Sequence, residues 1–198
     1  MTLLAGTEAI ETERLVLRRI EPSDLGFFTE IHTDPDVARY IGHGQPRPYS
    51  ETAQWLDDIL ASYAAAALGQ LAVIRKSDGA LIGRCGLSDA TIEREWAASA
   101  TRKGWFFSAH VPPGTAIELV PELGFTFGKA AWGQGFASEA AGRIYRYVRE
   151  QRAFAAIMSV IHPENRASLG VARKFGVTYI DQLELAGRVF DRYHWPLG

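Results

Sequence analysis

Residues 132–140 read WGQGFASEA, and this stretch decides the interpretation of the whole fold. It follows a run typical of a β-strand, residues 123–127, and precedes a helix expected over 138–149. Glycines at such a junction let consecutive backbone N–H groups point into one concave space. The helix N-terminus adds its unpaired N–H groups and the positive end of its dipole. The stretch therefore predicts a pyrophosphate-binding turn, with a tight turn that binds no ligand as the alternative.

The composition is that of an ordinary globular protein. The chain has 198 residues, 47% hydrophobic and 22% charged, with a net charge of -2. This favours one domain over residues 1–198 and gives no electrostatic footprint for a nucleic-acid partner. No apolar run approaches the ~20 residues that cross a membrane, and the acidic N-terminus lacks a signal-peptide pattern. We therefore expect a cytoplasmic protein without a membrane partner.

Neither a disulfide nor a metal site is expected. Cys85 is the single cysteine and sits among apolar neighbours, so it is interpreted as a small buried side chain. No cluster of cysteines and histidines has the spacing of metal ligands. His43 and His162 have no catalytic partner in the sequence pattern, and both are interpreted as structural.

Periodicity and turn residues place the elements before the glycine turn. Helices are expected over residues 22–31 and after Ser50, a good N-cap, and the loop over 33–50 is expected to line a cleft. Strands are expected over 14–18, 71–75 and 81–87, with a tight hairpin turn at 76–79.

The segment 88–117 is aromatic and weakly periodic, and we interpret it as an extended hairpin or insertion. Elements after it are expected at 122–127, 157–161, 177–185 and 189–195 as strands, and at 138–149 and 165–174 as helices. This order predicts an α/β fold, with a mixed central sheet of about six to seven strands and helices on both faces.

With the elements placed, the chain resembles the GNAT acetyltransferase superfamily, and within it the RimJ/RimL-like branch of ribosomal-protein N-terminal acetyltransferases. Four segments carry the resemblance: TERLVLR at 12–18, ELGF at 122–125, the 132–140 stretch, and residues 165–176. They cover about residues 12–195. The resemblance implies a single acyl-CoA N-acyltransferase domain. It departs at Trp132, where the superfamily often has Gln or Arg, and at Ala172, where many members carry a tyrosine acid.

The resemblance implies transfer of an acetyl group from acetyl-CoA to a primary amine by direct attack, with no metal. It assigns the CoA phosphates to backbone N–H groups of residues 134–138, and the pantetheine arm to the end of the preceding strand. A bulge is expected there, because it would aim one N–H group at the thioester oxygen. The expected cofactor-binding residues are Phe127, Gly133, Gln134, Gly135, Phe136, Ala137, Ser138 and Asn165. Asn165 is equally typical of a helix N-cap.

Glu122 is the candidate base that takes the proton of the amine. Strand alternation puts Glu122 and Gly124 on the face opposite Leu123 and Phe125. The alternative for Glu122 is a solvated glutamate in an ion pair, and Glu118 is the fallback base. By resemblance, Ser168 is the second catalytic residue, donating to the leaving thiolate. The alternative for Ser168 is a helix serine bonded one turn back.

The pKa of the acceptor amine favours an N-terminal α-amine of a protein or peptide. An α-amine has a pKa about 2.4 units below that of lysine, which saves on the order of 3 kcal/mol in deprotonation. A small-molecule amine such as an amino acid, polyamine or antibiotic remains open as the acceptor. A non-catalytic CoA-binding module and a generic nucleotide-binding protein are the other classes. A monomer or a homodimer is compatible with the sequence.

Overall fold

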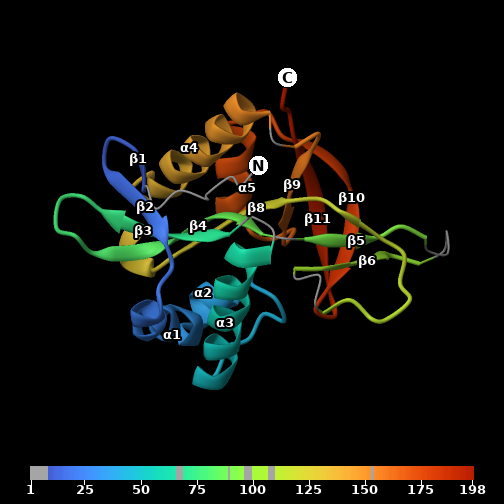
Figure 1. Ribbon diagram of the computed structural model, residues 1–198, viewed down its shortest axis with the longest axis horizontal. Helices are drawn as coiled ribbons and strands as arrows, with labels where there is room; N and C mark the ends of the chain where they lie inside the picture. The colour runs from blue at the N-terminus through green and yellow to red at the C-terminus, as the bar shows by residue number, and fades with distance from the viewer. Residues whose placement is uncertain (1–8, 66–68, 89, 96–99, 107–109, 153) are drawn as a thin grey trace.

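The computed structural model describes residues 9–65, 69–88, 90–95, 100–106, 110–152 and 154–198. Within them an 11-stranded sheet runs in the order β1-β2-β3-β4-β8-β9-β11-β10-β6-β5-β7. Figure 1 shows the helices α4 and α5 on one side of this sheet and α1, α2 and α3 on the other. The mixed α/β class and the helices on both faces are confirmed, while the sheet has more strands than the six to seven expected.

The first half of the chain builds an antiparallel sheet edge and the helices of one face. The strands are β1 (Ile10–Glu11), β2 (Leu15–Arg19), β3 (Gln70–Arg75) and β4 (Leu81–Ser88). The helices are the 3-10 turn η1 (Pro22–Asp24), α1 (Leu25–Thr33), α2 (Pro35–Ala38) and α3 (Tyr49–Ala65). Ser50 is not the N-cap of α3, because the helix already includes Tyr49.

The second half carries the glycine turn. It contains β8 (Glu122–Phe127), the 3-10 turn η3 (Lys129–Ala131), α4 (Phe136–Gln151), β9 (Ile157–Ile161), α5 (Arg166–Arg173), β10 (Thr178–Leu185) and β11 (Arg188–Trp195). The last two strands form the expected hairpin, and its turn residues Ala186 and Gly187 both have positive φ, 50° and 74°. Positive φ at both central positions matches the twist of the flanking strands.

The expected insertion adds the extra strands. β5 (Thr91–Glu93) pairs antiparallel with both β6 (Arg102–Trp105) and β7 (Ile117–Leu119). β6 also pairs in parallel with β10, through Leu183 and Arg102, so the insertion continues the main sheet. The aromatic residues Trp96 and Phe107 lie outside the described residues.

The two larger of three hydrophobic cores among the described residues lie on opposite faces of the sheet. Leu123 and Phe127 of β8 are buried in the core beneath α4 and α5, whereas Ala72 of β3 packs in the core of α1 and α3. This confirms the alternation predicted for β8. Cys85 is buried as expected.

Strand β8 pairs with its neighbours very differently on its two edges. Its ladder with β4 is regular from Gly83↔Phe127 to Ser88↔Glu122, so the bulge expected near Phe127 is not formed there. On the other edge, β8 pairs with β9 only at Glu122↔Met158. The unpaired edge of β8 beyond Glu122 is therefore where backbone groups remain for an extended ligand.

Candidate functional site

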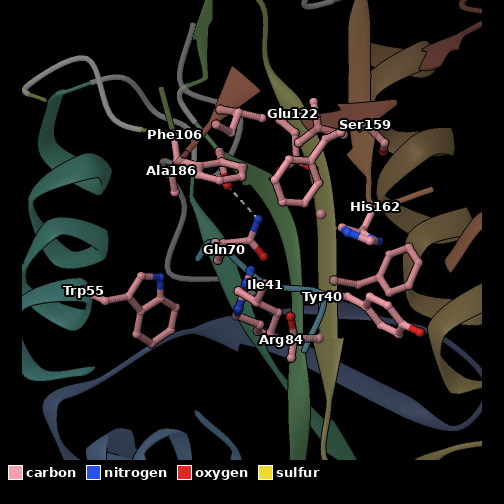
Figure 2. A pocket seen from close by; sticks show the side chains of 18 of the residues that line it. Tyr40, Ile41, Trp55, Gln70, Arg84, Phe106, Glu122, Ser159, His162 and Ala186 are labelled. Carbon is pink, nitrogen blue, oxygen red and sulfur yellow. Dashed lines mark hydrogen bonds between the residues drawn. The ribbon is translucent and has the colours of Figure 1, made fainter. Parts of the chain in front are cut away.

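A cavity of about 500 Å³ is lined by β8 and β9 residues beyond the point where these strands stop pairing. Other walls come from the loop after α2, from α3, from β3 and β4, from the start of α5 and from the insertion. Figure 2 shows Trp55 reaching in from α3 on one side, and Tyr40 and His162 on the other. Trp105 and Phe106 of the insertion line the cavity, and the segment 33–50 contributes residues as expected, although it is not a continuous loop because Pro35–Ala38 within it forms α2.

Glu122 is buried in this cavity, with only 6% of its surface exposed. Its carboxylate lies over Gly124, where a Cβ atom would come within 2.7 Å of Oε2. Burial raises the pKa of Glu122 to about 7, against the opposing effects of the Arg84 charge and a hydrogen bond from the Val160 backbone N–H. A carboxylate with this pKa exists in both forms near neutral pH, as a general base requires.

The alternatives considered for these glutamates were a solvated, ion-paired Glu122 and a catalytic Glu118. Glu122 is not solvated, and among the described residues no cation lies within ion-pair distance of it. The fallback Glu118 lies on β7, outside the cavity, and forms an ion pair with Arg102 at 3.5 Å.

Asn165 and Ser168 line the same cavity at the start of α5. Asn165 is the N-cap, because its side chain accepts a hydrogen bond from the Ser168 backbone N–H at 3.1 Å. Within the described structure the Ser168 hydroxyl makes no hydrogen bond to the preceding turn, so it is available to a ligand. Contact of either residue with CoA remains a prediction.

The glycine turn has the backbone form that the sequence predicted. Gly133 and Gly135 have φ of 72° and 82°, and Gly135 is the N-cap of α4 without a side-chain cap. Helical bonding begins with Glu139 N–H to Gly135 C=O at 3.1 Å. The N–H groups of Phe136, Ala137 and Ser138 therefore lack helical acceptors and are free for an anion. The helix starts two residues earlier than expected.

Side chains from other elements hold this turn in place. Arg14, the residue before β2, donates to the Gln134 carbonyl at 3.0 Å and to the Glu139 carboxylate at 2.7 Å. Lys174, at the end of α5, donates to Ser138 Oγ at 2.8 Å. The Lys174 ammonium thus places a positive charge beside the first turn of α4, a contribution that the sequence analysis did not identify.

Trp132 and Phe127 close the end of β8. The Trp132 indole N–H donates to the Phe127 carbonyl at 2.7 Å, while the Trp132 ring stays 47% exposed. The Phe127 side chain is buried in the core under α4. The carbonyl of Phe127 is therefore already engaged, which leaves the N–H groups of the turn as the clearest ligand-binding groups here.

Sequence reasoning also missed the polar residues on the floor of the cavity. Gln70, Arg84 and Arg47 come from β3, β4 and the loop before α3. Arg84 faces the cavity because it has the strand parity of Thr126, its partner in the β4–β8 ladder. A polar residue that interrupts the apolar run 81–87 was the available signal for Arg84.

No helix within the described ranges is both long and apolar enough to cross a bilayer. The same residues contain no group of three or more His, Cys, Asp and Glu side chains arranged to hold a metal ion.

Comparisons with known proteins show what this chain is similar to. Residues 14–178 match a family model described as an acetyltransferase (GNAT) domain. The chain is 27% identical over 198 residues to an uncharacterized N-acetyltransferase, p20, of Bacillus licheniformis, covering 96% of each chain. It is 24% identical to the FsC-acetyl coenzyme A-N(2)-transacetylase of Aspergillus fumigatus, covering 94% of this chain and 69% of the relative.

Solved structures show the same fold. An acetyltransferase from Agrobacterium tumefaciens superimposes with a TM-score of 0.70 at 21% identity, covering 96% of this chain and 95% of the other. RimL, a ribosomal L7/L12 alpha-N-protein acetyltransferase solved with coenzyme A, superimposes with a TM-score of 0.66 at 13% identity, covering 94% and 97%.

Proposed function

Because the chain belongs to the GNAT acetyltransferase family, we propose that it transfers an acetyl group from acetyl-CoA to a primary amine. The turn at residues 133–138 holds the diphosphate on backbone N–H groups, and the pantetheine arm follows the free edge of β8. The thioester then lies in the cavity where β8 and β9 separate. A proposed RimJ/RimL-like relationship agrees with the structural likeness to RimL.

The observation that carries the proposal is the buried carboxylate of Glu122, which lies at the point where β8 and β9 separate. The neutral amine nitrogen attacks the thioester carbonyl carbon, a C–N bond forms, and the C–S bond breaks. Glu122 takes the proton that the amine loses, directly or through one water. A pKa of about 7 leaves much of Glu122 ionised at neutral pH and able to accept it.

The leaving thiolate needs a hydrogen-bond donor or an acid. Ala172, where many superfamily members carry a tyrosine, is buried in the core and has no polar atom to offer. Ser168 lines the cavity with an unengaged hydroxyl, so we assign it as the donor to the thiolate. A hydrogen-bond donor is adequate because a thiol is far more acidic than an alcohol or an amine, so the sulfur can leave as its thiolate.

The acceptor that fits best is an α-amine. A single carboxylate supplies little help in deprotonating a lysine, for which the cost is on the order of 3 kcal/mol larger. An N-terminal α-amine of a protein or peptide, or a small-molecule amine of similar pKa, meets this condition. The name of RimL records an alpha-N-protein acceptor for that protein.

Release of free CoA from acetyl-CoA, measured with a thiol reagent in the presence of primary amines and peptides, tests the proposal. Glu122→Gln keeps the shape of the side chain and is expected to lower kcat by about 10²–10⁴-fold. Glu118→Gln is the matched control and is expected to retain the wild-type rate, because Glu118 lies outside the cavity. Full activity in Glu122→Gln refutes the base assignment. Acetyl-CoA binding without acetylation of any amine would support a CoA-binding module instead.

A further inference from the structure

Two arginines line the cavity that contains Glu122, and neither has a hydrogen-bonded acid. Arg84 projects from β4 with its guanidinium carbon 5.5 Å from the centre of the Trp55 ring. Its Nε atom is buried and has no hydrogen-bond partner. Arg47 enters from the loop before α3, where its backbone N–H is fixed on the His32 carbonyl at 2.9 Å. Among the described residues neither guanidinium forms an ion pair, although Glu51 and Glu122 act on them electrostatically from a longer distance.

The acids that face these arginines are engaged elsewhere. Glu51 contacts His43 at 3.2 Å, and Asp58 faces His110 at 3.6 Å. Glu122 lies over Gly124 and is bonded by the Val160 N–H. His162 supplies no negative charge. Burial lowers the pKa of both arginines, that of Arg84 to about 10, and the charges of Glu122 near Arg84 and of Glu51 near Arg47 oppose this effect only in part. Two cations in one cavity thus lack an anion that is hydrogen-bonded to either of them.

Gln70 contributes an unpaired hydrogen-bond acceptor, whereas Arg84 contributes an unpaired donor. Its amide nitrogen donates to the Gly86 carbonyl at 3.2 Å and to Ser88 Oγ at 2.9 Å, which fixes the orientation of the amide. Its Oε1 atom is buried and accepts no hydrogen bond. Figure 2 shows Gln70 and Arg84 projecting into the cavity. The cavity therefore presents buried donors for an anion and a buried acceptor for an N–H group.

We propose that the acceptor amine carries a carboxylate close to its nitrogen, which Arg47 and Arg84 bind while the nitrogen is directed toward Gln70 and Glu122. The inference rests on the proposed acetyl transfer and narrows its substrate class. A carboxylate has two oxygens and one negative charge, so each guanidinium gains a charge-assisted acceptor. A free α-amino acid meets this description, and so does a peptide whose first residue is acidic.

Matched acceptor pairs with and without a carboxylate test the inference, and every rate is expressed per neutral amine because a carboxylate also raises the pKa of the neighbouring amine. The first arm compares each amino acid that has a primary α-amine with its amide, and the second compares Asp-Ala amide with Asn-Ala amide. CoA release gives kcat/KM for every member. We expect the carboxylate member to be preferred at least tenfold in one arm, and the arm identifies the source of the carboxylate. Equal or better use of the neutral members overturns the inference while leaving acetyl transfer intact.

Variants of Arg47 and Arg84 test whether the preference for a carboxylate-bearing acceptor arises in this cavity. Arg47→Gln is expected to lower kcat/KM at least tenfold for the carboxylate acceptor and less than threefold for its neutral partner. Arg84→Gln also removes a charge that opposes the raised pKa of Glu122, so the expected result for this variant is a loss of kcat/KM at least tenfold larger for the carboxylate acceptor than for its neutral partner. Arg75→Gln is the control, since Arg75 pairs with Asp78 at the surface and does not line the cavity. A preference that survives both substitutions overturns the inference.

Calorimetric binding to Glu122→Gln protein, with CoA present, separates this inference from the proposed function. The carboxylate acceptor is expected to bind at least tenfold more tightly than its neutral partner even when no acetyl transfer occurs. Equal binding of the two members refutes the carboxylate site. Selective binding together with an inactive wild-type enzyme refutes only the proposed acetyl transfer.

Discussion

Glu122 is the residue on which the chemistry depends, and its burial sets the pH at which it acts. Burial raises its pKa to about 7. We expect kcat/KM, corrected for titration of the acceptor amine, to fall tenfold per pH unit below about pH 7, because only the ionised carboxylate accepts a proton. A pH-rate series on wild type and Glu122→Gln checks this. The same acid limb in the variant would show that another group is responsible.

The same burial makes Glu122 costly for stability above neutral pH. Its pKa rises from 4.5 to about 7 on folding, so the unfolded chain ionises first and stability is lost as the pH rises through this range. The loss approaches on the order of 3 kcal/mol by pH 8. Glu122→Gln removes it, so the variant is expected to gain stability over wild type between pH 4.5 and 8. Urea unfolding at several pH values measures the difference, and parallel stability curves would contradict it.

Gly124 provides the space in which the Glu122 carboxylate lies. A Cβ atom at Gly124 would come within 2.7 Å of Glu122 Oε2, so the flexible carboxylate must move. Gly124→Ala is therefore expected to lower kcat by about 10–100-fold, because small misplacements of reacting groups are costly. The free energy of unfolding is expected to change by less than about 1 kcal/mol. Kinetics and urea unfolding test both parts.

Gly26→Ala in α1 is the control for this substitution, since a Cβ atom there has no heavy atom within 4 Å. It is expected to keep kcat and to stabilise the protein by about 0.5–1 kcal/mol. If Gly124→Ala lowered the free energy of unfolding by as much as it raised the activation free energy calculated from kcat, the glycine would serve packing alone.

Strand alternation was enough to predict the face of the sheet on which Glu122 lies, but not its burial. The face opposite Leu123 is usually solvated in an isolated strand pattern. Here α3 and the loop before it cover that face, and they bring Trp55 and Arg47 over it. Arg47, Arg84 and Gln70 come together only through the sheet topology, which local sequence patterns do not contain.

At the scale of elements, we propose that the start of α4 and the end of α5 form one anion site. Lys174 donates to Ser138 Oγ at 2.8 Å, next to the free N–H groups of the helix. Lys174→Gln is expected to weaken CoA binding by about 3–10-fold. The difference in affinity between wild type and variant is expected to shrink at high salt, because dissolved ions screen the charge of Lys174. Calorimetric titration with CoA at low and high salt measures this. Lys103→Gln on β6 is the control, and an equal loss there would point to a non-specific charge effect.

Element boundaries depend on backbone geometry that residue types only partly reveal. The hairpin of β3 and β4 was predicted closely, because its turn residues stop the two apolar runs. The start of α4 was predicted two residues late, because Ser138 resembles an N-cap while Gly135, with φ of 82°, takes that position. Asn165 shows the reverse case, in which residue type and observed N-cap agree.

At the scale of the whole molecule, the extra strands come from pairing that no local pattern encodes. β6 joins β10 in parallel, across about eighty residues of sequence, and brings the insertion to the wall of the cavity. The separation of β8 from β9 is also a property of the whole sheet, since each strand has a complete partner on its other edge. The α/β class followed from the order of elements, whereas the number of strands did not.

A ligand that binds between the separated strands β8 and β9 is expected to stabilise the folded protein. Acetyl-CoA at one hundred times its dissociation constant is expected to stabilise the folded protein by about 2.7 kcal/mol. For a chain of 198 residues this corresponds to a rise in Tm of roughly 5–10 °C. ATP and NAD at the same concentration lack the pantetheine arm that follows the free edge of β8, so we expect them to raise Tm by less than about 1 °C. Thermal denaturation with acetyl-CoA, CoA, ATP and NAD measures these shifts. An equal shift with ATP or NAD would mean that the turn at 133–138 binds any diphosphate and that the separation of β8 and β9 contributes nothing to the choice of ligand.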